Sequence, residues 1–149
     1  EEQEIPSKMR IAVYGPVLGQ FQTLVSRLKT LPSEACFCVG PLFSSNVEEE
    51  QTQALLSGQL TLPCLVYFFD LGTEDFQLHV PNLLYLKAAD GIGDVIPLLG
   101  GRLRVAFTSP NFTLSSPSNN FETKCLEAGY AGCDFFFTAE WGKGISHLL

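Results

Sequence analysis

The hydrophobic residues of the first half gather in three short, continuous runs. These runs are Arg10–Gly15, Ala35–Gly40 and Cys64–Phe69, and the last of them is rich in Val, Tyr and Phe, residue types that favour strands. Because the runs are continuous and do not alternate with polar residues, each predicts a strand that is buried on both faces. Since the segments between the runs have a helical spacing, the strand–helix–strand–helix–strand order indicates a parallel sheet.

Two segments between these runs predict amphipathic helices. Gly19–Thr30 carries apolar residues three and four positions apart, which is the spacing of one helical face. The apolar residues of this face are Phe21, Leu24, Val25 and Leu28. Pro32 predicts the end of this helix. Glu48–Ser57 predicts a second helix that ends before Gly58, and the carboxylates of Glu48–Glu50 suit its first turn.

The second half changes character, because its apolar runs are shorter and glycine lies between them. The runs predict four strands, at Leu83–Leu86, Val95–Leu99, Leu103–Thr108 and Asp134–Thr138. The first three are separated by Asp90–Gly93 and Gly100–Gly101, a spacing that predicts antiparallel hairpins. Asn120–Gly129 predicts a further helix. The whole pattern predicts an α/β fold with a parallel first half and an antiparallel second half.

Length and charge limit the class of protein. At 149 residues the chain is long enough for one domain with a proper core, which we expect over residues 10–149 after a flexible acidic tail at residues 1–9. The net charge of −7 argues against a domain that grips nucleic-acid phosphates, because such affinity comes from Lys and Arg. No apolar run reaches the roughly 18 residues of a membrane span. The start EEQEIPSKMR does not resemble a secretory signal. We therefore expect neither direct nucleic-acid binding nor a membrane association, and a nuclear or, alternatively, cytoplasmic location.

The cysteines point to reduced thiols and not to a metal site. The five cysteines include no Cys-x-x-Cys pair. Cys36 and Cys38 share one face of a strand, but no second pair completes a zinc site. Buried thiols of an intracellular core are the expected interpretation.

The loops that follow the strands carry little chemistry. Gly15–Gly19 lies between a strand and a helix, where a phosphate could bind, but it is neither a dinucleotide-binding motif nor a P-loop. Of the two histidines, neither His79 nor His147 has a nucleophile or carboxylate at a telling spacing. Asp70, Glu74 and Asp75 form the one acidic cluster after a strand; they predict a helix-capping loop, with a metal or nucleotide site as the alternative.

These segments together resemble the calcineurin-like metallophosphoesterases, within them the lariat-debranching-enzyme branch, and most of all the N-terminal domain of the CwfJ family. The resemblance runs from about Arg10 to Ile145, and the final block is its most specific part. The segments that carry it are Gly15–Gly19, Phe37–Phe43, Leu71–Glu74, Asn82–Leu86, Leu103–Ser109, Asp134–Thr138, Trp141 and Gly142–Ile145. The resemblance implies a metallophosphoesterase-like β-sandwich flanked by helices. It also implies that the chain is a piece of a longer protein.

Active members of that family bind two metals through Asp, His and Asn side chains at the strand ends, and the metals activate water. At the matching positions this chain has Pro16, Leu18 and Pro41, and the third motif offers Gly72 and Thr73 in place of an Asn-His pair. The resemblance therefore implies lost metal ligands, no cofactor, no catalytic residue and an inactive phosphoesterase homologue.

The resemblance also suggests a function that does not need catalysis. It implies a protein-interaction scaffold in RNA processing, in a complex associated with splicing or lariat debranching, with RNA-processing proteins as partners. Trp141, Lys143 and Phe43 are the candidate contact residues. Two alternatives remain open: a scaffold subunit of another assembly, such as a trafficking complex, and a weak metal- or nucleotide-binding phosphoesterase that uses Asp70, Glu74 and Asp75.

Overall fold

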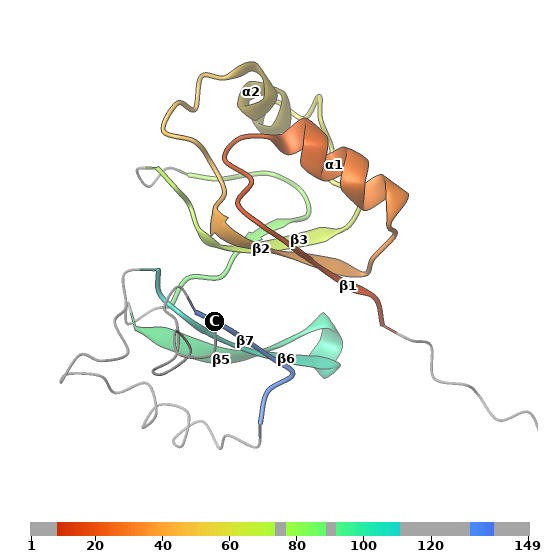
Figure 1. Ribbon diagram of the computed structural model, residues 1–149, viewed down its shortest axis with the longest axis vertical. Coiled ribbons are helices and arrows are strands. Elements are labelled where there is room, and N and C mark those ends of the chain that lie inside the picture. Colours follow the sequence, from red (N-terminus) through yellow and green to blue (C-terminus); the bar gives the residue numbers. More distant parts are fainter. Residues whose placement is uncertain (1–8, 74–76, 89–91, 111–131, 139–149) are drawn as a thin grey trace, which may run out of the picture. The chain divides into compact units, whose positions relative to one another are not determined.

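The chain forms two compact units, each with a sheet of its own. The computed structural model describes residues 9–73, 77–88, 92–110 and 132–138. The units comprise Glu1–Tyr85 and Leu86–Leu149, and both are drawn in Figure 1. In the described ranges, no helix combines the length and the apolar character that crossing a membrane requires.

The first unit is built on a parallel sheet of four strands. In spatial order these are β1 (Ile11–Tyr14), β2 (Ala35–Pro41), β3 (Leu65–Asp70) and β4 (Leu83–Tyr85). All three neighbouring pairs are parallel. The α/β class and the parallel first half predicted from the continuous apolar runs are thereby confirmed.

The pairing of β4 differs from the prediction. The run at Leu83–Leu86 was expected to form a hairpin with a later strand, but β4 pairs parallel with β3, in the register Val66↔Leu83. Asn82 directs this pairing from the residue before the strand. Its carbonyl accepts the Val66 N–H at 2.7 Å, and its side-chain amide donates to the Leu62 carbonyl at 3.2 Å. The antiparallel prediction was therefore wrong for this strand.

Two helices cover one face of this sheet. Figure 1 shows α1 (Phe21–Thr30) and α2 (Glu50–Leu56) on the same side of β2 and β3. Because the strands follow one another in a single direction across the sheet, right-handed connections place both helices on the same face. The four apolar residues predicted for α1 are its buried residues. Their partners on the sheet are Cys36, Cys38, Val66 and Phe68.

The other face of the sheet is aromatic. Phe37 stacks on Tyr67, with ring centroids 5.2 Å apart, and on Phe69, at 6.3 Å. Residues 35–38 and 66–69 are all buried. Consecutive side chains of a strand point to opposite faces of the sheet, so the side chains on both faces are buried from solvent. This agrees with the continuous apolar runs from which the two strands were predicted.

The second unit is a mixed sheet of three strands. β5 (Gly93–Leu98) and β6 (Leu103–Thr108) form an antiparallel hairpin around the short 3-10 helix η1 (Leu99–Gly101), as the glycines at 100–101 predicted. β7 (Phe135–Phe137) pairs with β6 in the parallel direction. The antiparallel prediction is thus confirmed for the hairpin, and β7 adds a parallel pair. The predicted helix at Asn120–Gly129 lies outside the described residues.

Candidate functional site

The loops that follow β1, β2 and β3 meet at one edge of the first sheet. Parallel strands bring their carboxyl ends together, and in open α/β sheets this is where ligands bind. We call this the carboxyl edge: residues 15–20 after β1, residues 42–49 after β2 and residues 71–73 after β3. It contains or adjoins the five positions that the resemblance assigns to lost metal ligands, namely Pro16, Leu18, Pro41, Gly72 and Thr73.

Backbone hydrogen bonds join these three loops to one another. The first loop donates to the second through Leu18 N–H to Pro41 O, at 3.2 Å, and Gly19 N–H to Leu42 O, at 3.0 Å. The second donates to the third in the same way, from Leu42 N–H to Asp70 O at 2.9 Å and from Phe43 N–H to Leu71 O at 3.0 Å. These four N–H groups therefore serve the contacts between loops and are not available to a bound phosphate.

Glycines allow the loops to approach this closely. Gly72 has a φ of 83°, and a Cβ at this position would overlap the backbone carbonyl oxygen of Phe43 and lie 2.9 Å from the Cβ of Pro41. Gly40, with a φ of 84°, lies against the ring of Pro16, whose Cβ and Cγ would be 3.3 Å from an added Cβ. Pro16 and Pro41, at two of the positions named by the resemblance, thus act as packing surfaces between neighbouring loops.

The apolar side chains of the first two loops differ in their exposure. Val17 is buried, whereas Leu18 is 48% exposed and has a φ of 49°. Phe43, proposed as a contact residue, is fully buried and meets the Phe21 ring edge to face, with centroids 5.3 Å apart. Phe43 therefore has a structural role, because its side chain belongs to the core and is not on the surface.

The carboxylates near this edge bind the backbone or a hydroxyl. Asp70 accepts a hydrogen bond from the Gly72 N–H at 3.0 Å, which holds the turn after β3. Among the described residues, no three His, Cys, Asp or Glu side chains come together as a metal site would need. Glu74 and Asp75, which would complete the acidic cluster, lie outside those residues, as do Trp141, Lys143 and His147. His79 is exposed in the connection between β3 and β4.

A polar network beside the first loop was not foreseen from the sequence. Ser44 donates to Glu49 Oε1 at 3.1 Å, and Glu49 Oε2 lies 3.1 Å from the position that a Cβ on Gly19 would occupy. Gln51 accepts the Gln22 N–H at 2.9 Å and so caps α1 from α2. The hydroxyl of Thr52 is buried and, within the described part of the chain, has no hydrogen-bond partner. No local motif signals these contacts, because they join residues of different elements.

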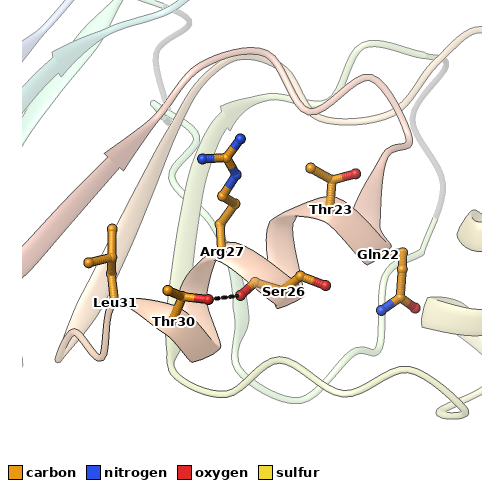
Figure 2. Close-up of a pocket in the computed structure, with 6 residues that line it drawn as sticks. All are labelled: Gln22, Thr23, Ser26, Arg27, Thr30 and Leu31. Atoms are coloured by element: carbon orange, nitrogen blue, oxygen red, sulfur yellow. Dashed lines mark hydrogen bonds between the residues drawn. The ribbon is translucent and has the colours of Figure 1, made fainter.

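The outer face of α1 borders a shallow hollow of about 510 Å³. Figure 2 shows its lining residues Gln22, Thr23, Ser26, Arg27, Thr30 and Leu31, which all come from this helix or its end. Thr30 donates its hydroxyl hydrogen to the Ser26 carbonyl at 3.0 Å, and Arg27 contributes the only charge among these six residues. The surface that lines the hollow is mostly apolar, and its residues form no arrangement of catalytic groups.

A second hollow lies at the edge of the first sheet where the strands begin, opposite the carboxyl edge. We call this the amino edge. The hollow there has a volume of about 280 Å³ and is lined by Leu28, Lys29, Pro32, Ser33, Pro63 and Cys64. Cys64 is half-buried. Burial is the larger of two causes that raise the pKa of its thiol, and the charge of the neighbouring Cys36 is the smaller.

Two further thiols of the first unit, Cys36 and Cys38, are buried, and like Cys64 they are free cysteines. A hydrogen bond with Cys38 lowers the pKa of Cys36, and the same hydrogen bond, reinforced by burial, raises the pKa of Cys38. A thiol with a raised pKa is mostly protonated near neutral pH and is a weak nucleophile. The arrangement favours a packing role for Cys38 and slow chemistry at Cys64.

Comparison with known proteins adds no relative. No protein-family model matches the chain, and no curated protein has a significantly similar sequence.

Proposed function

We propose that this protein is non-catalytic and acts as a protein-interaction scaffold. The observation that carries the proposal is the bonding of the three carboxyl-edge loops to one another. In a metallophosphoesterase this edge must hold metals and a phosphate in an open, polar site. Here Leu18, Gly19, Leu42 and Phe43 direct their N–H groups to neighbouring loops, so the edge is organised for internal packing.

The side chains at the former ligand positions support the same interpretation. Pro16, Pro41 and Gly72 make close contacts between loops, and none of them can donate a side-chain oxygen or nitrogen to a metal. Leu18 instead presents an apolar side chain at the surface. An exposed apolar side chain offers a contact to another protein and no ligand to a metal.

The biological setting of the proposal is RNA processing in the nucleus. It rests on the resemblance of Phe37–Phe43, Asn82–Leu86 and the block from Asp134 to Ile145 to the CwfJ family. The net charge of −7 supports partners that are proteins and not RNA. A scaffold role in a trafficking assembly would use the same surface, so the identity of the partners decides between the two settings.

Hydrolysis of bis(p-nitrophenyl) phosphate tests the non-catalytic part of the proposal. The purified chain is assayed with Mn²⁺, Zn²⁺, Ni²⁺ or Mg²⁺ and compared with metal alone and with the variant Asp70→Asn. We expect the rate with protein to equal the rate with metal alone. Metal-dependent hydrolysis that is lost in Asp70→Asn would overturn the proposal and favour the phosphoesterase alternative.

Affinity purification with quantitative mass spectrometry tests the scaffold part. The chain, Leu18→Asn and Leu31→Asn are compared as baits. Asn is well tolerated at the positive φ of Leu18, so this variant removes the apolar surface and keeps the loop. Leu31, which is 68% exposed, is the control at the amino edge.

We expect RNA-processing proteins to be enriched by the wild type and by Leu31→Asn, and to fall at least fivefold with Leu18→Asn. Enrichment of membrane-coat or adaptor proteins would move the proposal to the trafficking setting. Equal recovery by all three baits would show that the carboxyl edge is not the contact surface.

A further inference from the structure

Ser45 is an exposed residue in the loop between β2 and α2. Its neighbours carry the hydrogen bonds of this loop. Ser44 donates to Glu49 at 3.1 Å, and the Asn46 side chain accepts the Glu48 N–H at 3.1 Å. The side-chain hydrogen bonds of the described loop do not involve the Ser45 hydroxyl. This hydroxyl can therefore react without breaking an internal contact.

Three carboxylates follow Ser45 at fixed distances along the chain. Glu48, Glu49 and Glu50 are the third, fourth and fifth residues after it, and no other serine of the sequence has carboxylates at all three of these positions. Protein kinases select substrates by complementary charge, and one class of serine kinases reads acidic residues just after the serine. The segment from Ser45 to Glu50 carries the charge pattern that such an enzyme binds.

Ser45 and two of the three carboxylates lie outside α2, in a loop that turns at Asn46–Glu48. The helix begins only at Glu50, and Glu49 precedes it with φ −59° and ψ 147°, an extended conformation. Ser45 and the first two carboxylates thus lie before the helix. A kinase reaches the serine and reads these charges without unwinding α2.

We propose that Ser45 is a phosphorylation site for an acidophilic serine kinase. The Ser45 hydroxyl oxygen attacks the γ-phosphorus of ATP, the bond from that phosphorus to the ADP oxygen breaks, and the hydroxyl proton passes to the catalytic base of the kinase. The products are phosphoserine and ADP. This inference is independent of the scaffold function, because it uses only the accessibility and charge of the loop.

The modification changes the charge of the carboxyl edge. A phosphoserine adds about −1.5 to −2 charges at neutral pH, three residues from Glu48 and beside the Ser44–Glu49 hydrogen bond. Like-charge repulsion weakens the hold of this loop on Glu49, whose carboxylate lies over Gly19 of the first loop. Phosphorylation would therefore loosen the contact between the first two loops.

In vitro phosphorylation of the folded chain tests the proposal. The protein is incubated with an acidophilic serine kinase and ATP, and the modified residue is mapped by mass spectrometry. We expect about one phosphate per chain, on Ser45. The signal should be lost in Ser45→Ala, kept in Ser44→Ala, and reduced about tenfold when Glu48 and Glu49 are both changed to Gln.

The peptide of residues 41–52 serves as a second substrate, which separates the sequence pattern from the fold. Modification of both the peptide and the protein at Ser45 supports the proposal. Modification of the peptide alone would show that the fold hides the serine, and the proposal would be wrong. It would also be wrong if neither were modified, or if the phosphate were found only on other residues.

Discussion

The two edges of the first sheet differ in what their loops do. At the carboxyl edge, four backbone hydrogen bonds join successive loops, and glycine and proline pack them closely. At the amino edge, the turn after α1 and the segment before β3 leave a hollow of about 280 Å³ with the half-buried thiol of Cys64. Ligands of an open parallel sheet bind at its carboxyl edge. In this protein the loops of that edge are closely packed against one another.

The charges of the two edges differ as well. Glu48, Glu49, Glu50 and Asp70 lie at the carboxyl edge, where α2 begins and β3 ends. The basic residues Arg27 and Lys29 lie in the last turn of α1, at the amino edge. A carboxyl edge rich in carboxylates repels phosphate groups unless a metal offsets the charge.

The largest expected effect tests whether Phe43 anchors the carboxyl edge to the core. Phe43→Ala should lower the free energy of unfolding by about 3–5 kcal/mol, because it removes a fully buried ring and leaves a cavity beside Phe21. Equilibrium urea unfolding measures the change. At the amino edge, Leu31→Ala is the control and should change stability by less than about 0.5 kcal/mol. A loss below 1 kcal/mol for Phe43→Ala would contradict the proposed anchor.

The next effect compares two glycines that both have a positive φ. Gly72→Ala should cost about 3 kcal/mol, since its new Cβ meets the Phe43 carbonyl in addition to the strain of the backbone. Gly58→Ala follows α2 at the amino edge, where nothing lies within 4 Å of an added Cβ, and should cost only about 1 kcal/mol. Thermal unfolding of both variants gives the difference. Equal losses would mean that the carboxyl-edge loops are less closely packed than the structure has them.

A smaller effect of opposite sign is expected at Thr52. Its buried hydroxyl has no partner among the described residues, and an unsatisfied hydroxyl is costly to bury. Thr52→Val keeps the shape of the side chain and should raise the free energy of unfolding by about 1 kcal/mol. Thr30→Val, at the end of α1, removes an exposed hydroxyl that is hydrogen-bonded and should be neutral or slightly destabilising. A loss of stability in Thr52→Val would indicate that the hydroxyl does have a partner.

The smallest effect concerns the reactivity of the amino edge. Alkylation of Cys64 by iodoacetamide requires the thiolate, and burial and Cys36 raise its pKa. The midpoint of the pH–rate profile, followed by mass spectrometry of the Cys64 peptide, should therefore lie above the usual value for cysteine. Cys36→Ala should move the midpoint downward, because it removes the second cause of the shift. A wild-type midpoint below the usual value would show that Cys64 is activated instead.

The sequence predicts the elements of the first unit well, because their signals are local. The apolar face of α1 and the continuous runs of β2 and β3 need only the spacing of residues along the chain. The pairing of β4 was missed because its three residues carry no information on direction; the contacts of Asn82 with Leu62 and Val66 decide it. The pairing of a strand of only three residues depends on its tertiary contacts. The spacing of residues along the chain does not reveal those contacts.

At the candidate site, the sequence shows which residue types are present but not how they pack. Pro16 and Pro41 cannot bind a metal through their side chains, and this follows from residue type alone. Their packing against neighbouring loops and the contact of Phe43 with Phe21 join segments that are distant in sequence. Such contacts depend on how the loops fold over one another, which no local pattern encodes.

The hydrogen bonds between the carboxyl-edge loops also bear on the order of folding. They connect positions 18 and 19 with 41 and 42, and positions 42 and 43 with 70 and 71. Contacts over such separations close large loops and form only after the strands have aligned. We expect the carboxyl edge to assemble after the transition state, so that weakening it accelerates unfolding and leaves the refolding rate nearly unchanged. The carboxyl edge would then determine how long the native state persists.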